Sequence, residues 1–416
     1  MKKTLLQINV EANYGSTGRI ASEIGDLAMT KGWDSHIAYG RLMKDTDSTT
    51  YHIGTSFGIY HHVAYSRLSG KHGLASINDT QKLISYIEEI QPTIIHLHNL
   101  HGYYLNYETL FRYLNSSNIP VLWTLHDCWS FTGHCTHYED VGCYKWEKEC
   151  NSCPQKKEYP TSWLVDSSKN NYQRKKKWFG SHPNLHIVTV SNWLNQEVSR
   201  SFLSEHARTT IHNGIDTSIF KCTKSQALRT KFNLENKYII LGVASVWSGK
   251  KGLEDFITLS KTLEEDETLV LIGLKENQIK NLPKNIIGIQ RTANLEELVS
   301  WYSTANLYLN LSVEESFGMT TAESLACGTP VVVYDSTACP EMVTPKTGRV
   351  VPKKDIEAVR NAIHDIKIDF NESHYAQCRE YVAQRFDKNE RYEEYLSLYD
   401  QLTQPVPNKV LQTHES

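Results

Sequence analysis

The sequence predicts an α/β protein made of two doubly wound domains that face each other across a central cleft. Three observations support this prediction. The chain has 416 residues, which suits two domains of about 200 residues better than one core. In both halves, short runs of β-branched residues alternate with amphipathic stretches of helical period, as is typical of parallel sheets covered by helices. Between the halves, a strand-like run ends in Asn213-Gly214, a strong turn signal.

The first domain is expected over residues 1–211. Apolar residues recur at helical spacing in Ile20–Thr30 and Gln81–Ile90. The predicted strands are the apolar runs Leu5–Val10, Ser35–Tyr39, Thr93–Leu97, Val121–Leu125 and His186–Val190. Residues 128–160, called the insertion below, are rich in aromatic residues and cysteine but have little periodicity, so we expect an irregular segment there.

The second domain is expected over residues 212–387. Its predicted strands are Tyr238–Val246, Thr268–Ile272, Ile286–Gln290, Leu307–Leu311 and Val331–Tyr334. Its predicted helices lie near Leu253–Leu263, Leu295–Ser303 and Thr320–Ala326. We expect the amphipathic segment Lys388–Leu402 to pack back on the first domain. Residues 403–416 lose periodicity and gain Pro, Gln and Asn, which predicts a disordered tail.

Composition and charge exclude several classes of protein. The hydrophobic fraction is 40%, the charged fraction is 22% and the net charge is −3, so the chain lacks the basic character of a nucleic-acid-binding protein. The apolar run after Met1-Lys2-Lys3 is too short for a signal peptide. No stretch approaches the roughly 18 apolar residues of a membrane-spanning helix. We therefore expect a cytoplasmic protein without a nucleic-acid partner.

One basic segment suits contact with a membrane surface. Arg174-Lys175-Lys176-Lys177-Trp178-Phe179 puts four cations beside two aromatic residues. Such a segment can bind anionic lipid at the inner face of a membrane, which would be useful if the acceptor is lipid-linked. The alternative is a solvated helix face.

The most informative segment begins at Glu315, where a predicted strand gives way to a short helix. The positive end of the helix dipole and the free N–H groups of the first turn suit a pyrophosphate. Glu323 lies eight residues after Glu315, on the order of 10 Å along a helix, so the two carboxylates suit opposite ends of a sugar nucleotide. The alternative is that they only occupy a favourable helix start. Further donor contacts are expected from Ser316, Phe317, Gly318 and Met319.

Other residues at predicted strand ends suit the same ligand. Lys251 follows a strand beside two glycines, where its ammonium would neutralise a departing diphosphate; the alternative is a solvated lysine turn. Gly15 opens the first helix, so the backbone can approach a phosphate there. This turn lacks the G-x-G-x-x-G pattern of dinucleotide-binding proteins. Further donor contacts are expected from Ser245, Arg291 and Thr292.

Polar residues also follow two strands of the first domain. Because the carboxyl ends of strands face the ligand crevice in open α/β sheets, we expect His126 to point into the cleft. The acceptor-binding residues expected nearby, with aromatic rings that could stack on a sugar, are His98, Asn99, Tyr103, Asp127 and Trp129. Two alternatives stay open, namely purely structural histidines and metal binding by His96, His98 and His101.

Four of the nine cysteines cluster in the insertion. Cys135, Cys143, Cys150 and Cys153 have the spacing C-x7-C-x6-C-x2-C. Four thiolates can hold a structural zinc ion, and C-x2-C is the usual half-site. The alternatives are four reduced cysteines in a loop ordered by its aromatic residues, or a redox role.

Taken together, these motifs resemble the retaining glycosyltransferases of family 4, which have the GT-B fold. Glu315-Ser316-Phe317-Gly318 through Glu323 resembles the E-x7-E motif of that family, and Lys251-Gly252 resembles its phosphate-binding lysine. Asn213-Gly214-Ile215-Asp216 resembles its interdomain N-G-[IV]-D signature. Ser245-Val246 stands where many members have an arginine, and Arg291 is the candidate replacement. The segments that begin at His96 and His126 are most similar to bacterial exopolysaccharide enzymes of the colanic-acid type.

The resemblance implies roles for individual residues. Glu315 would contact the donor hexose, Glu323 the ribose, Lys251 the diphosphate and His126 the sugar near its reacting face, so that Glu315, Lys251 and His126 are the expected catalytic residues. The implied reaction moves a hexose-type sugar from a nucleotide diphosphate sugar to a glycan or lipid-linked acceptor with retention of configuration, in the synthesis of a surface polysaccharide. Catalysis would need no cofactor. The alternatives are a GT-B epimerase, a glycan phosphorylase and a non-catalytic sugar-nucleotide or glycan-binding protein.

Overall fold

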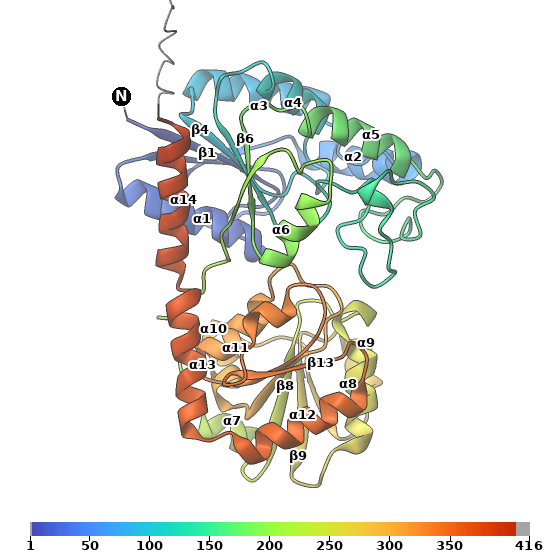
Figure 1. Cartoon of the computed structure of the whole chain (residues 1–416), viewed down its shortest axis with the longest axis vertical. Helices are drawn as coiled ribbons and strands as arrows, with labels where there is room; N and C mark the ends of the chain where they lie inside the picture. The colour runs from blue at the N-terminus through green and yellow to red at the C-terminus, as the bar shows by residue number, and fades with distance from the viewer. Residues whose placement is uncertain (1, 405–416) are drawn as a thin grey trace, which may run out of the picture.

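The computed structural model describes residues 2–404, which form two α/β domains with one parallel sheet each (Figure 1). This architecture confirms the predicted fold class. The predicted tail from residue 405 onwards lies outside the described residues. Within the described range, no helix combines the length and the apolar character needed to cross a membrane.

The first sheet has the strand order β3-β2-β1-β4-β5-β6-β7, and β1 pairs in parallel with both β2 and β4. Its central strands are buried on both faces because helices cover both sides. The strands are β1 (Thr4–Asn9), β2 (Asp34–Tyr39), β3 (Thr49–His52), β4 (Ile94–Leu97), β5 (Val121–Leu125), β6 (Leu185–Thr189) and β7 (Ala207–Thr210). The helices are α1 (Gly15–Thr30), α2 (Ser56–Ser69), α3 (Ile77–Ile90), α4 (Tyr107–Leu114), η1 (Lys145–Glu147), α5 (Ser168–Phe179) and α6 (Asn192–Ser199).

The second sheet has the strand order β10-β9-β8-β11-β12-β13 and is also parallel. Its strands are β8 (Tyr238–Val243), β9 (Glu267–Ile272), β10 (Ile286–Ile289), β11 (Leu307–Asn310), β12 (Val331–Tyr334) and β13 (Gly348–Val351). Its longer helices are α7 (Gln226–Lys231), α8 (Leu253–Leu259), α10 (Leu295–Thr304), α11 (Met319–Ala326), α12 (Ile356–Asp369) and α13 (Glu372–Arg385). Its shorter ones are η2 (Gly249–Lys251), η3 (Ser260–Thr262), α9 (Glu276–Lys280) and η4 (Cys339–Met342).

All ten predicted strands are present, and most of their ends agree within one residue. The largest error is in β8, which ends at Val243 rather than Val246; the side chain of Val246 is 56% exposed. The sequence pattern did not reveal β3, β7 or β13. All three carry partly exposed side chains, so no continuous buried run marks them.

The strand order of each sheet reverses at one place, between β1 and β4 in the first sheet and between β8 and β11 in the second. Ligands of open α/β sheets bind beyond the carboxyl ends of the strands at such a reversal. The segments that follow these four strands contain predicted site residues from both domains, namely Gly15, His98, Ser245, Lys251 and Glu315.

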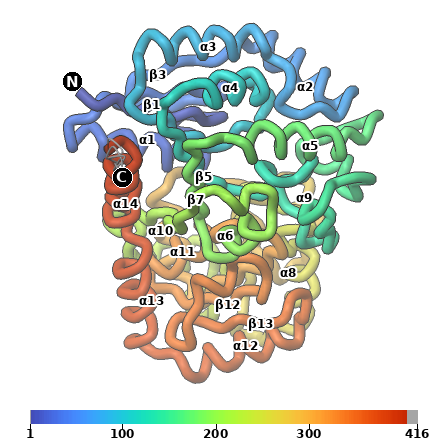
Figure 2. Tube along the Cα trace, turned by 45° about the horizontal axis from the view of Figure 1, so that its top comes forward, coloured from blue at the N-terminus to red at the C-terminus, as the bar shows by residue number. Residues whose placement is uncertain are grey.

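The helix α14 (Lys388–Leu402) returns from the second domain and lies beside α1 of the first (Figures 1 and 2). Tyr392, Tyr395 and Tyr399 are buried there against Ile20 and Ile24 of α1. The apolar face of this helix therefore belongs to the core of the first domain, although the helix follows the second domain in the chain.

The chain crosses between the domains twice, and the two crossings are bonded to each other. The N–H of Ile215 donates to the carbonyl of Phe386 at 2.7 Å, and the N–H of Lys388 donates to the carbonyl of Ile215 at 3.0 Å. Lys388 also pairs with Asp216 at 2.6 Å. We call this pair of crossings, residues 215–216 and 386–388, the hinge.

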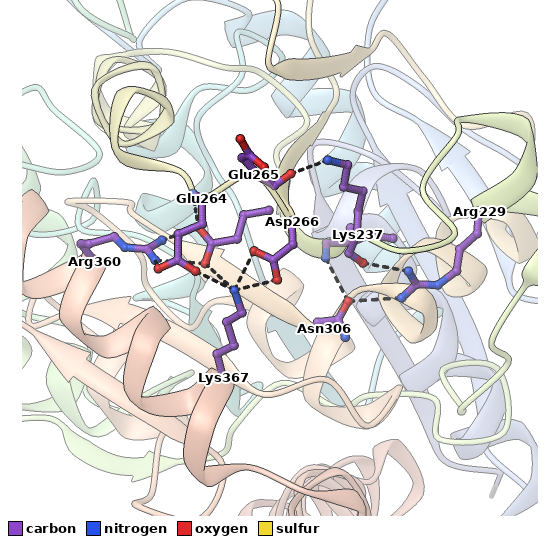
Figure 3. Close-up of polar contacts among 10 residues, drawn as sticks. Arg229, Lys237, Glu264, Glu265, Asp266, Asn306, Arg360 and Lys367 are labelled. Carbon is purple, nitrogen blue, oxygen red and sulfur yellow. Dashed lines mark hydrogen bonds and ion pairs between the residues drawn. The ribbon is translucent and has the colours of Figure 1, made fainter.

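A dense polar network closes the amino-terminal end of the second sheet (Figure 3). Glu267, the first residue of β9, pairs with Arg360 at 2.5 Å and with Lys367 at 3.4 Å. Lys367 also reaches Glu264 and Asp266, both at 2.9 Å. Both cations come from α12, so the network ties that helix to the sheet.

The basic segment of α5 differs from the free cationic patch that the sequence suggested. Lys175 and Phe179 are buried in the first domain, and Arg174 pairs with Glu108 of α4 at 2.7 Å. This helix packs on the core with one side, so only Lys176 and Lys177 of the four cations stay exposed. The segment Arg174–Phe179 is therefore partly a packing surface with fewer free cations than expected, and its contact with a membrane stays a prediction.

Candidate active site

The N-terminus of α11 presents unpaired backbone donors at the carboxyl end of the second sheet. Gly318 precedes the helix with a φ of 96°, and no side chain caps this end. Within residues 2–404, the N–H groups of Phe317, Gly318 and Met319 have no recorded acceptor. Free donors at the positive end of a helix attract anions, so the helix start has the properties that the sequence predicted.

Lys251 and Glu315 meet beside this helix start. The Nζ atom of Lys251 lies 2.5 Å from Oε1 of Glu315. Gly252 permits this approach because it has a φ of 73° and because a Cβ there would lie 2.4 Å from the carbonyl oxygen of Leu311. Burial opposes the charge of Lys251, but the neighbouring Glu315 carboxylate outweighs it and raises the pKa of the lysine. The pair therefore presents both charges at the helix start.

Glu323 lies on α11 with 6% of its surface exposed. Its Oε2 accepts a hydrogen bond from the hydroxyl of Tyr302 at 3.0 Å. Burial raises the pKa of Glu323 to about 7, although the charge of Arg19 and the Tyr302 hydroxyl act in the opposite direction. Arg19 belongs to α1, so a charge of the facing domain affects the pKa of Glu323. Because that pKa is about 7, a small change in the surroundings of Glu323 changes its protonation near neutral pH.

Two predicted histidines of the first domain lie together at the ends of β4 and β5. Nδ1 of His98 is 3.1 Å from Nε2 of His126, and Nε2 of His98 is 3.0 Å from Oε1 of Gln7. Burial lowers the pKa of His126 to about 4, against the raising effect of Asp127, and it lowers the pKa of His98 well below its usual value. Both imidazoles are therefore neutral near pH 7 and can act as hydrogen-bonding groups.

Asp127 forms hydrogen bonds with two neighbouring residues of the first domain. Its Oδ2 lies 2.8 Å from Nε2 of His101, and its Oδ1 accepts the N–H of Trp129 at 2.8 Å. Burial raises the pKa of this carboxyl, but His101 and the Trp129 amide outweigh burial and lower the pKa to about 2. Asp127 is thus an ionised group that fixes His101 and the turn after β5.

Two aromatic residues expected to stack on an acceptor are packed inside the domain. Trp129 is 1% exposed and has the ammonium of Lys175 3.4 Å from its ring centroid. Tyr103 is 6% exposed and meets Tyr159 edge-on. The stacking role expected for both is corrected, because neither ring has an open face. Likewise, the ring nitrogens of His96 bond to Tyr399 and Thr124 at 2.7 Å, which disfavours the metal alternative for this histidine.

Of the remaining predicted donor residues, Gly15, Ser245 and Ser316 lie beside the strand reversals, whereas Arg291 and Thr292 do not. Gly15 begins α1 with a φ of 63° and is exposed, and Ser245 is exposed after β8. Ser316 is partly buried before α11. Arg291 and Thr292 follow β10, which lies two strands from β8.

On the facing domain, the expected acceptor residue Asn99 lies after β4, where its N–H donates to Oδ1 of Asn9. The four cysteines of the insertion line one cavity.

Sequence reasoning missed a contact between the insertion and the second domain, which we call the clasp. Lys250 Nζ lies 2.8 Å from Oε1 of Gln155 and 2.8 Å from Oε2 of Glu314. Asp140 donates its N–H to Oε1 of Glu314 at 3.0 Å. The clasp is formed by Lys250, Glu314, Asp140 and Gln155. The one available signal was that Lys250 and Glu314 are the sequence neighbours of Lys251 and Glu315.

A second missed contact lies nearer the hinge. The carboxylate of Glu341 accepts the N–H groups of Asn192 and Trp193, at 2.9 and 2.6 Å, at the start of α6. His212 lies 3.4 Å from the same carboxylate. This carboxylate of the second domain therefore binds a helix terminus of the first, and no pattern around Glu341 indicated it.

Two facing parallel-sheet lobes of this kind constitute the GT-B fold of glycosyltransferases. Solved structures with that fold match the chain over nearly its full length. Sucrose-phosphate synthase from Thermosynechococcus elongatus matches with a TM-score of 0.71 at 17% identity, covering 96% of this chain and 99% of its own. HepE from Anabaena, solved with UDP-glucose, matches with a TM-score of 0.64 at 14% identity, covering 96% of this chain and 99% of its own.

Sequence comparisons then define the family. The model "Glycosyltransferase Family 4" matches residues 22–219, and "Glycosyl transferases group 1" matches residues 224–385. The putative colanic acid biosynthesis glycosyl transferase WcaC of Escherichia coli is 22% identical over 368 residues, covering 85% of this chain and 88% of WcaC. CapM of Staphylococcus aureus, a capsular polysaccharide biosynthesis glycosyltransferase, is 22% identical over 231 residues, covering 51% of this chain and 61% of CapM. The chain belongs to glycosyltransferase family 4 and is a glycosyltransferase.

Proposed function

We propose that this protein is a retaining glycosyltransferase that moves a hexose from a nucleotide diphosphate sugar to a glycan or lipid-linked acceptor during the synthesis of a surface polysaccharide. The observation that carries this proposal is the Lys251–Glu315 pair beside the open N–H groups at the start of α11. The relatives support the substrate class, because WcaC and CapM are both described as polysaccharide biosynthesis enzymes. The UDP-glucose complex of HepE supports the donor class.

The donor would bind across α11 by charge. The diphosphate would take the N–H groups of Phe317, Gly318 and Met319 and draw the ammonium of Lys251 towards it. Glu315 would then face the hexose hydroxyls, and Glu323 would accept a hydrogen bond from the ribose. Donors already oriented towards the developing charge of a leaving group stabilise the transition state without reorganising.

The same charges suggest a displacement on one face of the sugar. The bond from the anomeric carbon to the diphosphate oxygen breaks while the acceptor oxygen approaches from the same side. The acceptor proton passes to the departing diphosphate, so no protein nucleophile is needed. His126 is neutral near pH 7 and would hydrogen-bond a sugar hydroxyl near the reacting carbon. Asp127 is occupied by His101, so a role as general base does not suit it.

A donor screen tests this proposal. Purified protein is heated with UDP-, GDP- and ADP-sugars, and the unfolding midpoint is recorded for the wild type and for Lys251→Ala and Glu323→Gln. We expect one nucleotide family to raise the midpoint of the wild type and to raise it less in both variants. Stabilisation that is equal in all three proteins would place the donor elsewhere.

Product analysis separates the competing functions. The preferred donor is incubated with candidate glycan and lipid-linked acceptors, and products are identified by mass spectrometry and NMR. A glycosyltransferase releases the nucleotide diphosphate and forms a glycoside, whose anomeric configuration matches the donor if the enzyme is retaining. An epimerase instead returns an isomeric sugar nucleotide, and a binding protein returns the donor unchanged.

A further inference from the structure

We propose that Cys135, Cys143, Cys150 and Cys153 bind one zinc ion that holds the insertion in the shape required by the clasp. All four residues line one cavity of about 20 Å³ between η1 and the start of α5. That volume suits a single ion rather than an organic ligand. Chain segments up to 18 residues apart in sequence therefore converge on one point through their cysteines.

Backbone donors point at two of the sulfurs. The N–H of Gly133 donates to Sγ of Cys150 at 3.2 Å, and the N–H of Gln155 faces the sulfur of Cys153. An N–H group bonds an anionic sulfur more strongly than a neutral thiol, and such outer-shell bonds orient metal ligands. Gly133 is needed for its approach, because a Cβ there would lie 2.2 Å from the carbonyl oxygen of Ser168. The insertion is thus built around sulfur acceptors.

The zinc ion would also explain how the insertion keeps one conformation. Within residues 128–160 the structure has a single short helix, η1, and no strand, so few regular hydrogen bonds offset the entropy of ordering it. Cys143 lies three residues after Asp140, and Cys153 lies two residues before Gln155. Each insertion residue of the clasp therefore lies within three residues of a metal ligand.

Zinc would tighten the cavity. Within the described residues, no three of the sulfurs lie mutually within 4.8 Å, whereas tetrahedral zinc with Zn–S bonds of about 2.3 Å places them roughly 3.8 Å apart. Binding would release four protons from the thiols and draw the four loops inwards. This contraction predicts greater thermal stability with the metal than without it.

Metal analysis of the full-length protein tests the proposal directly. Protein purified without chelator is analysed for zinc and iron by mass spectrometry, and its free thiols are counted under denaturing conditions. We expect about one zinc per chain, no disulfide among the four cysteines and loss of zinc in a Cys150→Ser/Cys153→Ser double variant. The exposed Cys222 provides the matched control, since Cys222→Ser keeps the metal. The zinc content and free thiols of the wild-type protein test the proposal even if the double variant does not fold.

Three outcomes would overturn the assignment: wild-type protein with four free thiols and no metal after dialysis against zinc, disulfides among the four residues, or iron in place of zinc. A second readout addresses the role. Chelation of the wild type should speed tryptic cleavage within the insertion and lower the unfolding midpoint, and added zinc should reverse both effects. Chelation without either change would show that the metal does not order the insertion. Neither readout depends on the proposed transferase reaction.

Discussion

The second domain buries a carboxylate at each end of its sheet and surrounds the two in opposite ways. At the amino end, Glu267 receives Arg360 at 2.5 Å and Lys367 at 3.4 Å, both from its own domain. At the carboxyl end, Glu323 receives the neutral hydroxyl of Tyr302 at 3.0 Å, and the cation that acts on it, Arg19, belongs to the other domain. Burial alone therefore does not identify a ligand site. The carboxylate at the candidate site differs from Glu267 because, among the described residues, the cation that acts on it comes from the other domain.

The largest expected effect is on turnover at the carboxyl end. Lys251→Ala removes the cation beside Glu315, so we expect the rate of transfer to fall by about 100-fold or more, as for other groups that stabilise a developing charge. The unfolding midpoint should change little because the pair is partly exposed. Steady-state kinetics with the preferred donor measure the effect. Lys250→Ala is the matched control: it removes the two clasp contacts of Lys250 and leaves the bond from Asp140 to Glu314. An equal loss of turnover in both variants would contradict the separate role given to Lys251.

The next largest effect should be on stability at the amino end. Arg360→Met leaves the buried Glu267 with Lys367 as its one cation in the network, so the free energy of unfolding should fall by on the order of 3 kcal/mol. Denaturant unfolding measures this change. Donor affinity should stay that of the wild type. If Arg360→Met bound donor less well but kept the stability of the wild type, the assignment of this network to stability rather than to donor binding would be wrong.

A smaller, pH-dependent effect is expected for Glu323. Its pKa rises from 4.5 to about 7 on folding, so between these values the folded protein binds more protons than the unfolded chain does. The stability that Glu323 contributes is therefore present at low pH and is lost as the pH rises to about 7. Glu323→Gln should remove about 3 kcal/mol of this pH dependence. Unfolding free energies measured across the window for both proteins test the assignment, which a parallel pair of curves would refute.

The smallest effect is expected for Asp266→Asn, which removes an exposed member of the amino-end network. Lys367 keeps Glu264 and Glu267 as partners, and exposed ion pairs contribute little. We expect an unfolding midpoint close to that of the wild type and well above that of Arg360→Met. A loss as large as that of Arg360→Met would show that the network depends on all its members equally.

Local patterns made the second domain the easier one to predict. Apart from β13, its strands are mainly apolar runs. Glu315, Glu323 and Lys251 lie on segments whose turns are set by nearby glycines. The first domain was harder, because the rule for strand ends locates a residue but does not say which way its side chain turns. Trp129 follows β5 as expected, yet its ring is buried under Lys175.

Contacts between distant segments were beyond the reach of sequence patterns. Glu341 binds the start of α6, about 150 residues away in the chain, and Lys250 meets Gln155 across the domains. Neither Glu341 nor Gln155 belongs to a recognisable motif. The burial of Lys175 was hidden for a similar reason, since a lysine within a basic run normally indicates a solvated surface.

The hinge has a mechanical consequence. Because Ile215 and residues 386–388 are bonded together, both crossings turn about a single axis, and displacement grows with distance from it. The rings of Phe317 and His212 lie 5.6 and 5.4 Å from the ring of Phe386 in the hinge, whereas the insertion lies on the far side of the molecule from α13 and α14 (Figure 1). A rotation that scarcely moves the start of α11 would separate the insertion from the second domain, including Gln155 from Lys250 and Asp140 from Lys354. Any separation of the two lobes would therefore be widest at the clasp edge, where Lys250, Gln155, Asp140 and Glu314 hold the insertion against the second domain.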